Sequence, residues 1–154
     1  MNPYDEKLRR YIEENLINAE HLSFSRSCHS VAEAAEAVGG VPDDLVKNIC
    51  LIDSEGGLIV AIVKGEDRVS TSRVSGLLSV DAVRTARAEE ILALTGYPVG
   101  GTPSFGYPAR FLIDPKVMEK DMVYSGGGSP NSLVKISPED LSAANRGTVA
   151  RIRR

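Results

Sequence analysis

Several features are scarce or missing in this sequence, and each absence excludes a class of protein. Only two cysteines occur among 154 residues, Cys28 and Cys50, which excludes a disulfide framework and a zinc cage built on thiolates. No apolar run reaches the ~20 residues that a membrane-spanning helix needs. The first six residues are polar and acidic, unlike a signal peptide. These absences predict a cytoplasmic protein with reduced thiols.

An excess of positive charge is also missing. The chain carries 18 basic and 21 acidic residues and a net charge of −3, so no overall field attracts nucleic acid. The exception is the segment 145–154, which has four arginines and no acid. Its arginines are either a solvated terminus or contacts to phosphate, and the sequence leaves both readings open. Arg146, Arg151, Arg153 and Arg154 are the candidate phosphate contacts, together with Lys64 and Arg68.

What is present fits one globular unit of mixed structure. Hydrophobic residues make up 42% and charged residues 25% of the chain, which predicts a single domain over residues 1–154. Periodicity and turn signals predict helices at 3–17, 30–39, 72–78, 86–95 and from 137 onward, and strands at 19–24, 46–52, 58–63, 110–113, 122–124 and 132–136. The order lacks a strict alternation of strand and helix. It therefore predicts an α+β fold, with a mixed and largely antiparallel sheet surrounded by helices.

Motifs for phosphate, dinucleotide and metal binding fail on inspection. The segment 101–106 has the glycine spacing of a P-loop, but Tyr107 stands where the lysine belongs. No GxGxxG follows a strand. His21 and His29, the only histidines, have no carboxylate at metal-ligand spacing, and we interpret both as ordinary surface or core residues. No metal or cofactor is expected.

Nucleophile motifs are equally weak. Ser104 lies in Thr-Pro-Ser-Phe-Gly, which approaches a nucleophile elbow but lacks its first glycine and its strand-to-helix setting. Ser132 and Lys135 have S-x-x-K spacing, but on a strand they point to opposite faces. Cys28 has His29 beside it, yet adjacent residues rarely reach nucleophile–base geometry. A passive Cys28 is the better interpretation.

Three features remain as candidates for chemistry. Lys47 interrupts the apolar run 45–52, and in strand alternation it shares a face with Ile49 and Leu51. A charge there is costly unless it is paired or faces a cleft. The other two features are the glycine-rich loops 96–106 and 125–132, whose glycines permit close backbone approach and whose N–H groups can surround an oxygen.

These features occur in the order and spacing of a known family. The segments 30–39, 46–49, 95–106, 111–114 and 124–132 together resemble the YbaK-like and prolyl-tRNA-synthetase-associated editing domains, over roughly residues 20–142. One departure lies in the first glycine loop: the family's proline falls at Ser104, and this chain has its proline one residue earlier, at Pro103.

The resemblance implies a barrel-like sheet surrounded by helices and an activity, hydrolysis of mischarged aminoacyl-tRNA without metal or cofactor. It implies catalytic roles for Lys47, Gly100 and Gly101. The residues implied in substrate binding are Asn48, Thr102, Pro103, Ser104, Gly106, Gly126, Gly127, Gly128 and Asn131. Aminoacyl-tRNA is the implied partner, an aminoacyl-tRNA synthetase is a second candidate, no membrane is involved, and a monomer or weak homodimer is expected.

Two other functions stay open at this point. The same lysine and loops could serve a binding module for tRNA ends or nucleotides that performs no chemistry. A serine hydrolase acting through Ser104 is the third reading. The sequence does not specify which amino acid or which tRNA is the substrate.

Overall fold

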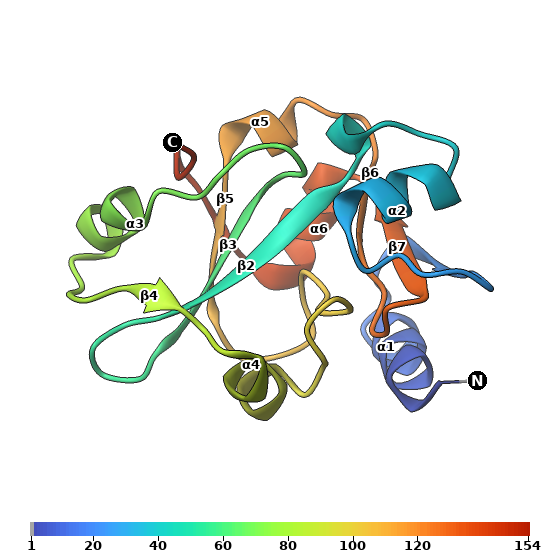
Figure 1. Ribbon diagram of the computed structural model, residues 1–154, viewed down its shortest axis with the longest axis horizontal. Coiled ribbons are helices and arrows are strands. Elements are labelled where there is room, and N and C mark those ends of the chain that lie inside the picture. The colour runs from blue at the N-terminus through green and yellow to red at the C-terminus, as the bar shows by residue number, and fades with distance from the viewer. Residues whose placement is uncertain (1) are drawn as a thin grey trace.

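Six α-helices and eight strands form the part of the chain that the computed structural model describes, residues 2–154 (Figure 1). The helices are α1 (Pro3–Glu14), α2 (Val31–Ala37), α3 (Thr71–Leu78), α4 (Ala88–Thr95), α5 (Pro115–Met118) and α6 (Pro138–Asn145), with a short 3₁₀ helix at Pro42–Asp44. The strands are β1 (Ala19–Ser23), β2 (Val46–Ile52), β3 (Leu58–Lys64), β4 (Arg84–Thr85), β5 (Arg110–Ile113), β6 (Val123–Gly126), β7 (Ser132–Ile136) and β8 (Thr148–Val149).

The strands form two sheets, one with the order β1-β7-β6 and one with the order β4-β2-β3-β5-β8. Only the pairings β3–β5 and β5–β8 are parallel, so the predicted α+β class and the largely antiparallel character are confirmed. A single bridge between Leu45 and Tyr124 connects the two sheets at the start of β2. The described residues therefore show no closed barrel, and the barrel-like shape is not confirmed.

The long hairpin of β2 and β3 crosses the centre of the molecule (Figure 1). Apart from Lys47, Asn48 and Lys64, its two faces are both apolar, as is typical of a strand pair covered on both sides. Cys50 and Ile52 of one face pack into the main core, while Leu51 packs with Ile59 and Val63 on the other. The predicted hairpin is confirmed. Buried residues on both faces of β2 hold this strand in place.

Helix starts follow their capping signals, whereas one helix end was predicted too late. Ser30 and Glu33 form both bonds of the capping box that begins α2. Helix α1 ends at Glu14, not at residue 17, because Leu16 adopts φ 51° and is 91% exposed. The apolar spacing that included Leu16 therefore overestimated the helix.

The C-terminal segment is part of the fold, which corrects the reading of a solvated terminus; phosphate contact by the exposed Arg146, Arg151 and Arg154 stays a prediction. β8 pairs in parallel with β5, and the side chain of Ile152 is fully buried. Arg153 Nη1 lies 2.8 Å from Oδ1 of Asp114, whose side chain is also fully buried. The segment 148–153 is thus not a solvated terminus, and the Arg153 guanidinium is bound within the fold. Lys64, another candidate phosphate contact, is paired with Asp43 at 2.6 Å.

In residues 2–154, no helix has the length and apolar character needed to cross a bilayer.

Candidate functional site

A cavity of about 170 Å³ opens along the first half of β2, between the start of α2, one end of α4 and the glycine loops. Its lining is mostly apolar and includes no Asp or Glu; it consists of Cys28, His29, Ser30, Val31, Ala34, Leu45, Val46, Lys47, Asn48, Ile49, Ile91, Val99, Gly100, Thr102, Ser125, Gly126 and Leu133. Of the residues that the sequence nominated, the structure places Lys47, Asn48, Gly100, Thr102 and Gly126 on its wall.

The cavity forms where β2 has an open edge. On the side away from β3, strand β4 pairs only with Leu51 and Ile52, and the bridge to β6 engages only Leu45. Residues 47–49 therefore have no strand paired to them through backbone hydrogen bonds on this edge within residues 2–154. The backbone N–H and C=O groups of an unpaired strand edge are available to bind a ligand, and here that edge lines the cavity.

Lys47 is the one cation on the cavity wall. No carboxylate lies within 4 Å of its Nζ in the described part of the chain, in contrast to Lys64 and Lys120, which both pair with Asp43. Burial lowers the pKa of Lys47, the negative charge of Asp67 opposes this shift, and the positive charge of Arg68 adds to it. The ammonium group is half-buried and free to bind a ligand.

Asn48 joins β2 to both glycine loops. Its Nδ2 donates to the carbonyl of Thr102 at 2.9 Å and to Oγ of Ser125 at 3.2 Å. Its Oδ1 accepts from Oγ of Ser104 at 2.7 Å, and the Ser104 and Ser125 hydroxyls lie 2.6 Å apart. The amide is fully engaged in this network, so its role is to fix the loops against the strand.

The two glycine loops touch each other and form one wall. Gly128 N–H donates to the carbonyl of Gly101 at 2.7 Å. A Cβ on Gly126 would overlap the carbonyl of Thr102, and a Cβ on Gly101 would lie 2.7 Å from the backbone of Gly128. Glycine is required at both positions by the close approach of two backbones, which neither loop sequence reveals alone.

Backbone donors on the wall include those of two residues in the first glycine loop. The N–H groups of Gly100 and Thr102 donate to no acceptor within residues 2–154. Gly101 differs, because its N–H donates to the carbonyl of Pro98 at 3.1 Å and the residue does not line the cavity. Gly100 has φ +87°, a conformation that favours glycine. These two free donors lie on either side of Gly101.

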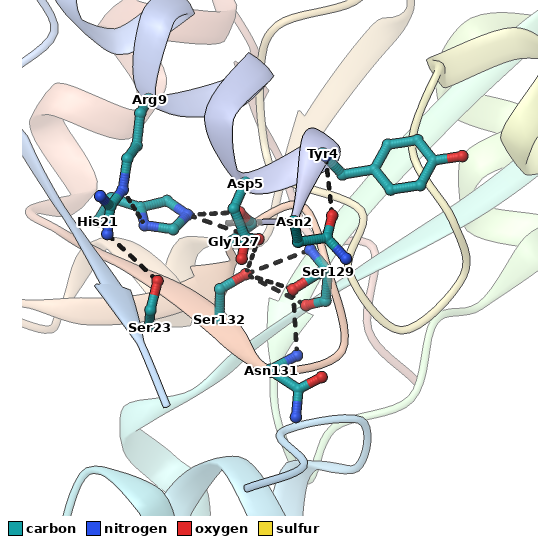
Figure 2. A network of polar contacts seen from close by, with 10 residues as sticks. All are labelled: Asn2, Tyr4, Asp5, Arg9, His21, Ser23, Gly127, Ser129, Asn131 and Ser132. Atoms are coloured by element: carbon teal, nitrogen blue, oxygen red, sulfur yellow. Dashed lines mark hydrogen bonds and ion pairs between the residues drawn. The ribbon is translucent and has the colours of Figure 1, made fainter. Parts of the chain in front are cut away.

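The second glycine loop is anchored by α1 (Figure 2). Ser132 Oγ donates to Oδ1 of Asp5 at 2.6 Å, and both side chains are buried. Arg9 Nε donates to Nδ1 of His21 at 3.0 Å, so the ring proton lies on Nε2, 2.7 Å from the carbonyl of Gly127. Burial lowers the pKa of His21 although the Gly127 carbonyl favours the cation. This polar network holds the loop and does not reach the cavity.

Several nominated residues lie behind the wall. Ser104 is fully buried and its hydroxyl meets only Asn48 and Ser125, so no base reaches it. The carbonyl of Pro103 accepts from the hydroxyl of Tyr107 at 2.6 Å. Asn131 Nδ2 donates to the carbonyl of Arg26 at 2.9 Å, away from the cavity. Gly101, Pro103, Ser104, Gly106, Gly127, Gly128 and Asn131 all stay outside the cavity lining.

The cysteines offer no nucleophile. Both thiols are buried, and burial raises the pKa of Cys28 and raises that of Cys50 to about 11. Residues 2–154 contain no cluster of three or more His, Cys, Asp or Glu side chains placed to hold a metal ion. His29, which the sequence gave no reason to select, does line the cavity. Its only sequence signal is its position just before the N-cap of α2.

Known proteins share this fold, with sequence identities between 24% and 31%. A crystal structure of a protein proposed to be a trans-editing enzyme for prolyl tRNA synthetase matches with a TM-score of 0.92 and 25% identity, covering 100% of this chain and 99% of that one. A hypothetical protein of known crystal structure matches with a TM-score of 0.89 and 31% identity, over 96% of this chain and 99% of that one.

Two curated relatives show different coverage. The proline–tRNA ligase of Trichlorobacter lovleyi is 30% identical over 84 residues, which is 54% of this chain and only 15% of the ligase. The uncharacterized protein YwhH of Bacillus subtilis is 24% identical over 121 residues, 77% of this chain and 76% of that protein. The family described as the aminoacyl-tRNA editing domain matches residues 25–144, which include every residue of the cavity wall. With most of its length and its whole cavity inside that match, the chain belongs to the aminoacyl-tRNA editing domain family.

Proposed function

We propose that this chain is an aminoacyl-tRNA deacylase that acts in trans, hydrolysing the ester between a wrongly attached amino acid and the 3′ end of a tRNA. Membership of the editing family supports the reaction class. The observation that carries the proposal is Lys47, a cation without a carboxylate partner in residues 2–154, on the wall of a cavity whose lining has no acid. The Lys47 ammonium is free to stabilise the ester carbonyl oxygen when it becomes negatively charged during attack.

The proposed reaction uses positioning and charge. The ester carbonyl lies against the Lys47 ammonium and the free N–H groups of Gly100 and Thr102. When a nucleophile attacks, the negative charge on that oxygen develops next to these donors, which need no rearrangement to stabilise it. Aminoacyl esters are already activated, so stabilisation and orientation can supply the required rate without metal or cofactor.

The cavity limits which amino acid fits. Val31, Ala34, Leu45, Ile91 and Leu133 give it apolar walls, and its volume is about 170 Å³. An apolar cavity of about 150 Å³ holds one benzene-sized molecule. We therefore infer that the site takes an aminoacyl group with a small or medium apolar side chain. A synthetase is a second candidate partner, because the ligase relative carries the matching segment within a much longer chain.

A panel of tRNAs, each charged with a different amino acid, tests the proposal. The loss of ester is measured against the spontaneous rate with wild-type protein, Lys47→Met and Ser104→Ala. We expect faster loss for one or a few small apolar amino acids, none with Lys47→Met, and continued turnover with Ser104→Ala. Binding of charged tRNA without any faster loss would indicate a binding module instead. A folded but inactive Ser104→Ala together with an active Lys47→Met would indicate a serine hydrolase.

A further inference from the structure

The two histidines differ in how their rings are engaged. Both ring nitrogens of His21 have hydrogen-bond partners, Arg9 and the Gly127 carbonyl, and His21 is not part of the cavity lining. The ring of His29 makes no hydrogen bond or ion pair within residues 2–154, although it lines the cavity and is exposed. An imidazole with both nitrogens free at the mouth of a site can accept or donate a proton there.

The position of His29 is fixed by contacts from distant parts of the chain. Segment 24–28 is bound to the second glycine loop: Phe24 N–H donates to the carbonyl of Asn131, and Cys28 N–H donates to that of Pro130. Asn131 Nδ2 holds the Arg26 carbonyl at 2.9 Å. His29 N–H donates to Oγ of Ser27 at 3.2 Å. The backbone that carries the imidazole is therefore tied to the wall of the cavity.

The imidazole ring of His29 lies against Gly100. A Cβ on Gly100 would overlap the imidazole, so the ring lies directly over the backbone of this residue. Gly100 also carries a free N–H group on the wall. The His29 imidazole therefore lies beside the Gly100 N–H, a hydrogen-bond donor that could stabilise a negatively charged oxygen. This contact gives a second reason for glycine at position 100, besides its φ of +87°.

The charged groups near His29 come from β2, from its own segment and from α2. Lys47 faces the cavity from β2, and the cavity residues of both glycine loops and of α4 carry no charge. On its own segment, Arg26 pairs with Glu36 at 3.1 Å, while Glu33 Oε1 is held by the Ser30 hydroxyl at 3.1 Å. No carboxylate lines the cavity. His29 is placed to accept a proton.

We propose that His29 is the general base of the deacylation reaction, an inference that rests on the proposed function. The imidazole removes a proton from a water molecule while the water oxygen bonds to the ester carbon. The electron pair of the carbonyl moves onto its oxygen, next to Lys47. The bond to the 3′ oxygen then breaks, and the imidazolium returns its proton to that oxygen. The products are the free amino acid and the uncharged tRNA, so atoms and charges balance.

Single-turnover deacylation from pH 5 to 9, on the charged tRNA found in the panel, tests this role. Wild type is compared with His29→Ala and His29→Gln. General base catalysis contributes about 100-fold to 10,000-fold, so we expect both variants to lose at least about 100-fold in rate with little change in KM. The wild-type rate should fall toward acidic pH, and the variants should lose that dependence. Added imidazole should restore part of the rate to His29→Ala but not to His29→Gln, whose side chain still fills the space.

Each other outcome has a definite meaning. A raised KM with unchanged rate and pH dependence would overturn the inference, because His29 would then only bind the tRNA. A wild-type rate in His29→Ala, with Lys47→Met inactive, would overturn the inference and leave the proposed function standing. A wild-type protein that deacylates no tRNA overturns both. The matched control is Ser25→Ala, an exposed residue of the same segment outside the cavity lining, which should keep the wild-type rate.

Discussion

Two charged sites in this molecule show opposite arrangements. At the C-terminus, the buried carboxylate of Asp114 is surrounded by donors: the N–H groups of Lys116, Ile152 and Arg153, and the Arg153 guanidinium. On the cavity wall, the Lys47 ammonium has no carboxylate within 4 Å in residues 2–154. A buried charge with every partner supplied stabilises a fold, whereas a charge without partners costs free energy and is available to a substrate. Four substitutions or deletions test this contrast.

The largest effect is expected from deletion of residues 148–154. The deletion removes buried Ile152, strand β8 and the partner of Asp114. An unpaired buried charge costs about 3–5 kcal/mol and a lost core aliphatic side chain about 2–5 kcal/mol, together close to the whole stability of a typical domain. We expect no cooperative thermal transition by circular dichroism. The exposed Arg151→Ala should melt like wild type, and an unchanged Tm of the deletion would show the segment to be dispensable.

The second largest effect is expected from Asp114→Asn. Burial alone would raise the pKa of Asp114, but the three backbone donors and Arg153 lower it below its ordinary value. The stability that this carboxylate contributes is therefore full above the unfolded-state pKa of about 3.9 and is lost as pH falls through the lower folded-state pKa. We expect the variant to lose about 3 kcal/mol at pH 7, measured by urea unfolding.

The pH dependence provides the check on Asp114→Asn. As pH falls below about 4, the difference in free energy of unfolding between wild type and variant should narrow, because the wild-type carboxylate becomes protonated. A difference that stayed constant down to strongly acidic pH would show that packing, and not charge, accounts for the loss. Deacylation at neutral pH should continue in the folded fraction of the variant, since Asp114 lies outside the cavity lining.

Lys47→Met should have the opposite effect to Asp114→Asn, with a loss of activity and no loss of stability. The change keeps an unbranched apolar stem and removes the charge, so deacylation should fall at least about 100-fold, the loss typical of removing one donor to an oxyanion. The free energy of unfolding should stay the same or rise by up to about 1 kcal/mol, because a half-buried charge without a partner is removed. Single-turnover kinetics and urea unfolding measure the two effects. Loss of both activity and stability would mean that Lys47 supports the fold instead.

The same contrast explains which features the sequence could predict. The β2–β3 hairpin follows from two apolar runs around Asp53 and Gly57, which are local signals. The C-terminal segment could not be placed in this way, because β8 has only two residues and its partners, Asp114 and β5, lie more than 30 residues earlier in the chain. Its arginines suggested phosphate contact, although the pairing of Arg153 depends on tertiary structure.

The candidate site divides in a similar way. Lys47 could be found because a cation in an apolar strand is a local anomaly, and Gly100 because its loop is richer in glycine than a turn requires. His29 could not be found, because it reaches the cavity only through bonds such as that between Arg26 and Asn131, 105 residues apart. Asn131 was nominated for the substrate, but its amide holds the segment that carries His29. Contacts of this range leave no periodicity in the sequence.

The smallest effect is expected from Asp67→Asn, which changes the surroundings of Lys47 without touching the cavity. Asp67 lies just after β3, and its Oδ2 is buried without a partner within residues 2–154. Its charge raises the pKa of Lys47 against the effect of burial.

If the reaction needs the ammonium form, activity is lost as pH rises through the pKa of Lys47. Removing the Asp67 charge lowers that pKa, so the alkaline fall in rate should move to lower pH while the rate at pH 7 changes less than about tenfold. Deacylation rates between pH 7 and 10.5 measure the shift, with the exposed neighbour Glu66→Gln as the matched control. An alkaline limb at the same pH in wild type, Asp67→Asn and Glu66→Gln would show that the ammonium of Lys47 does not set it.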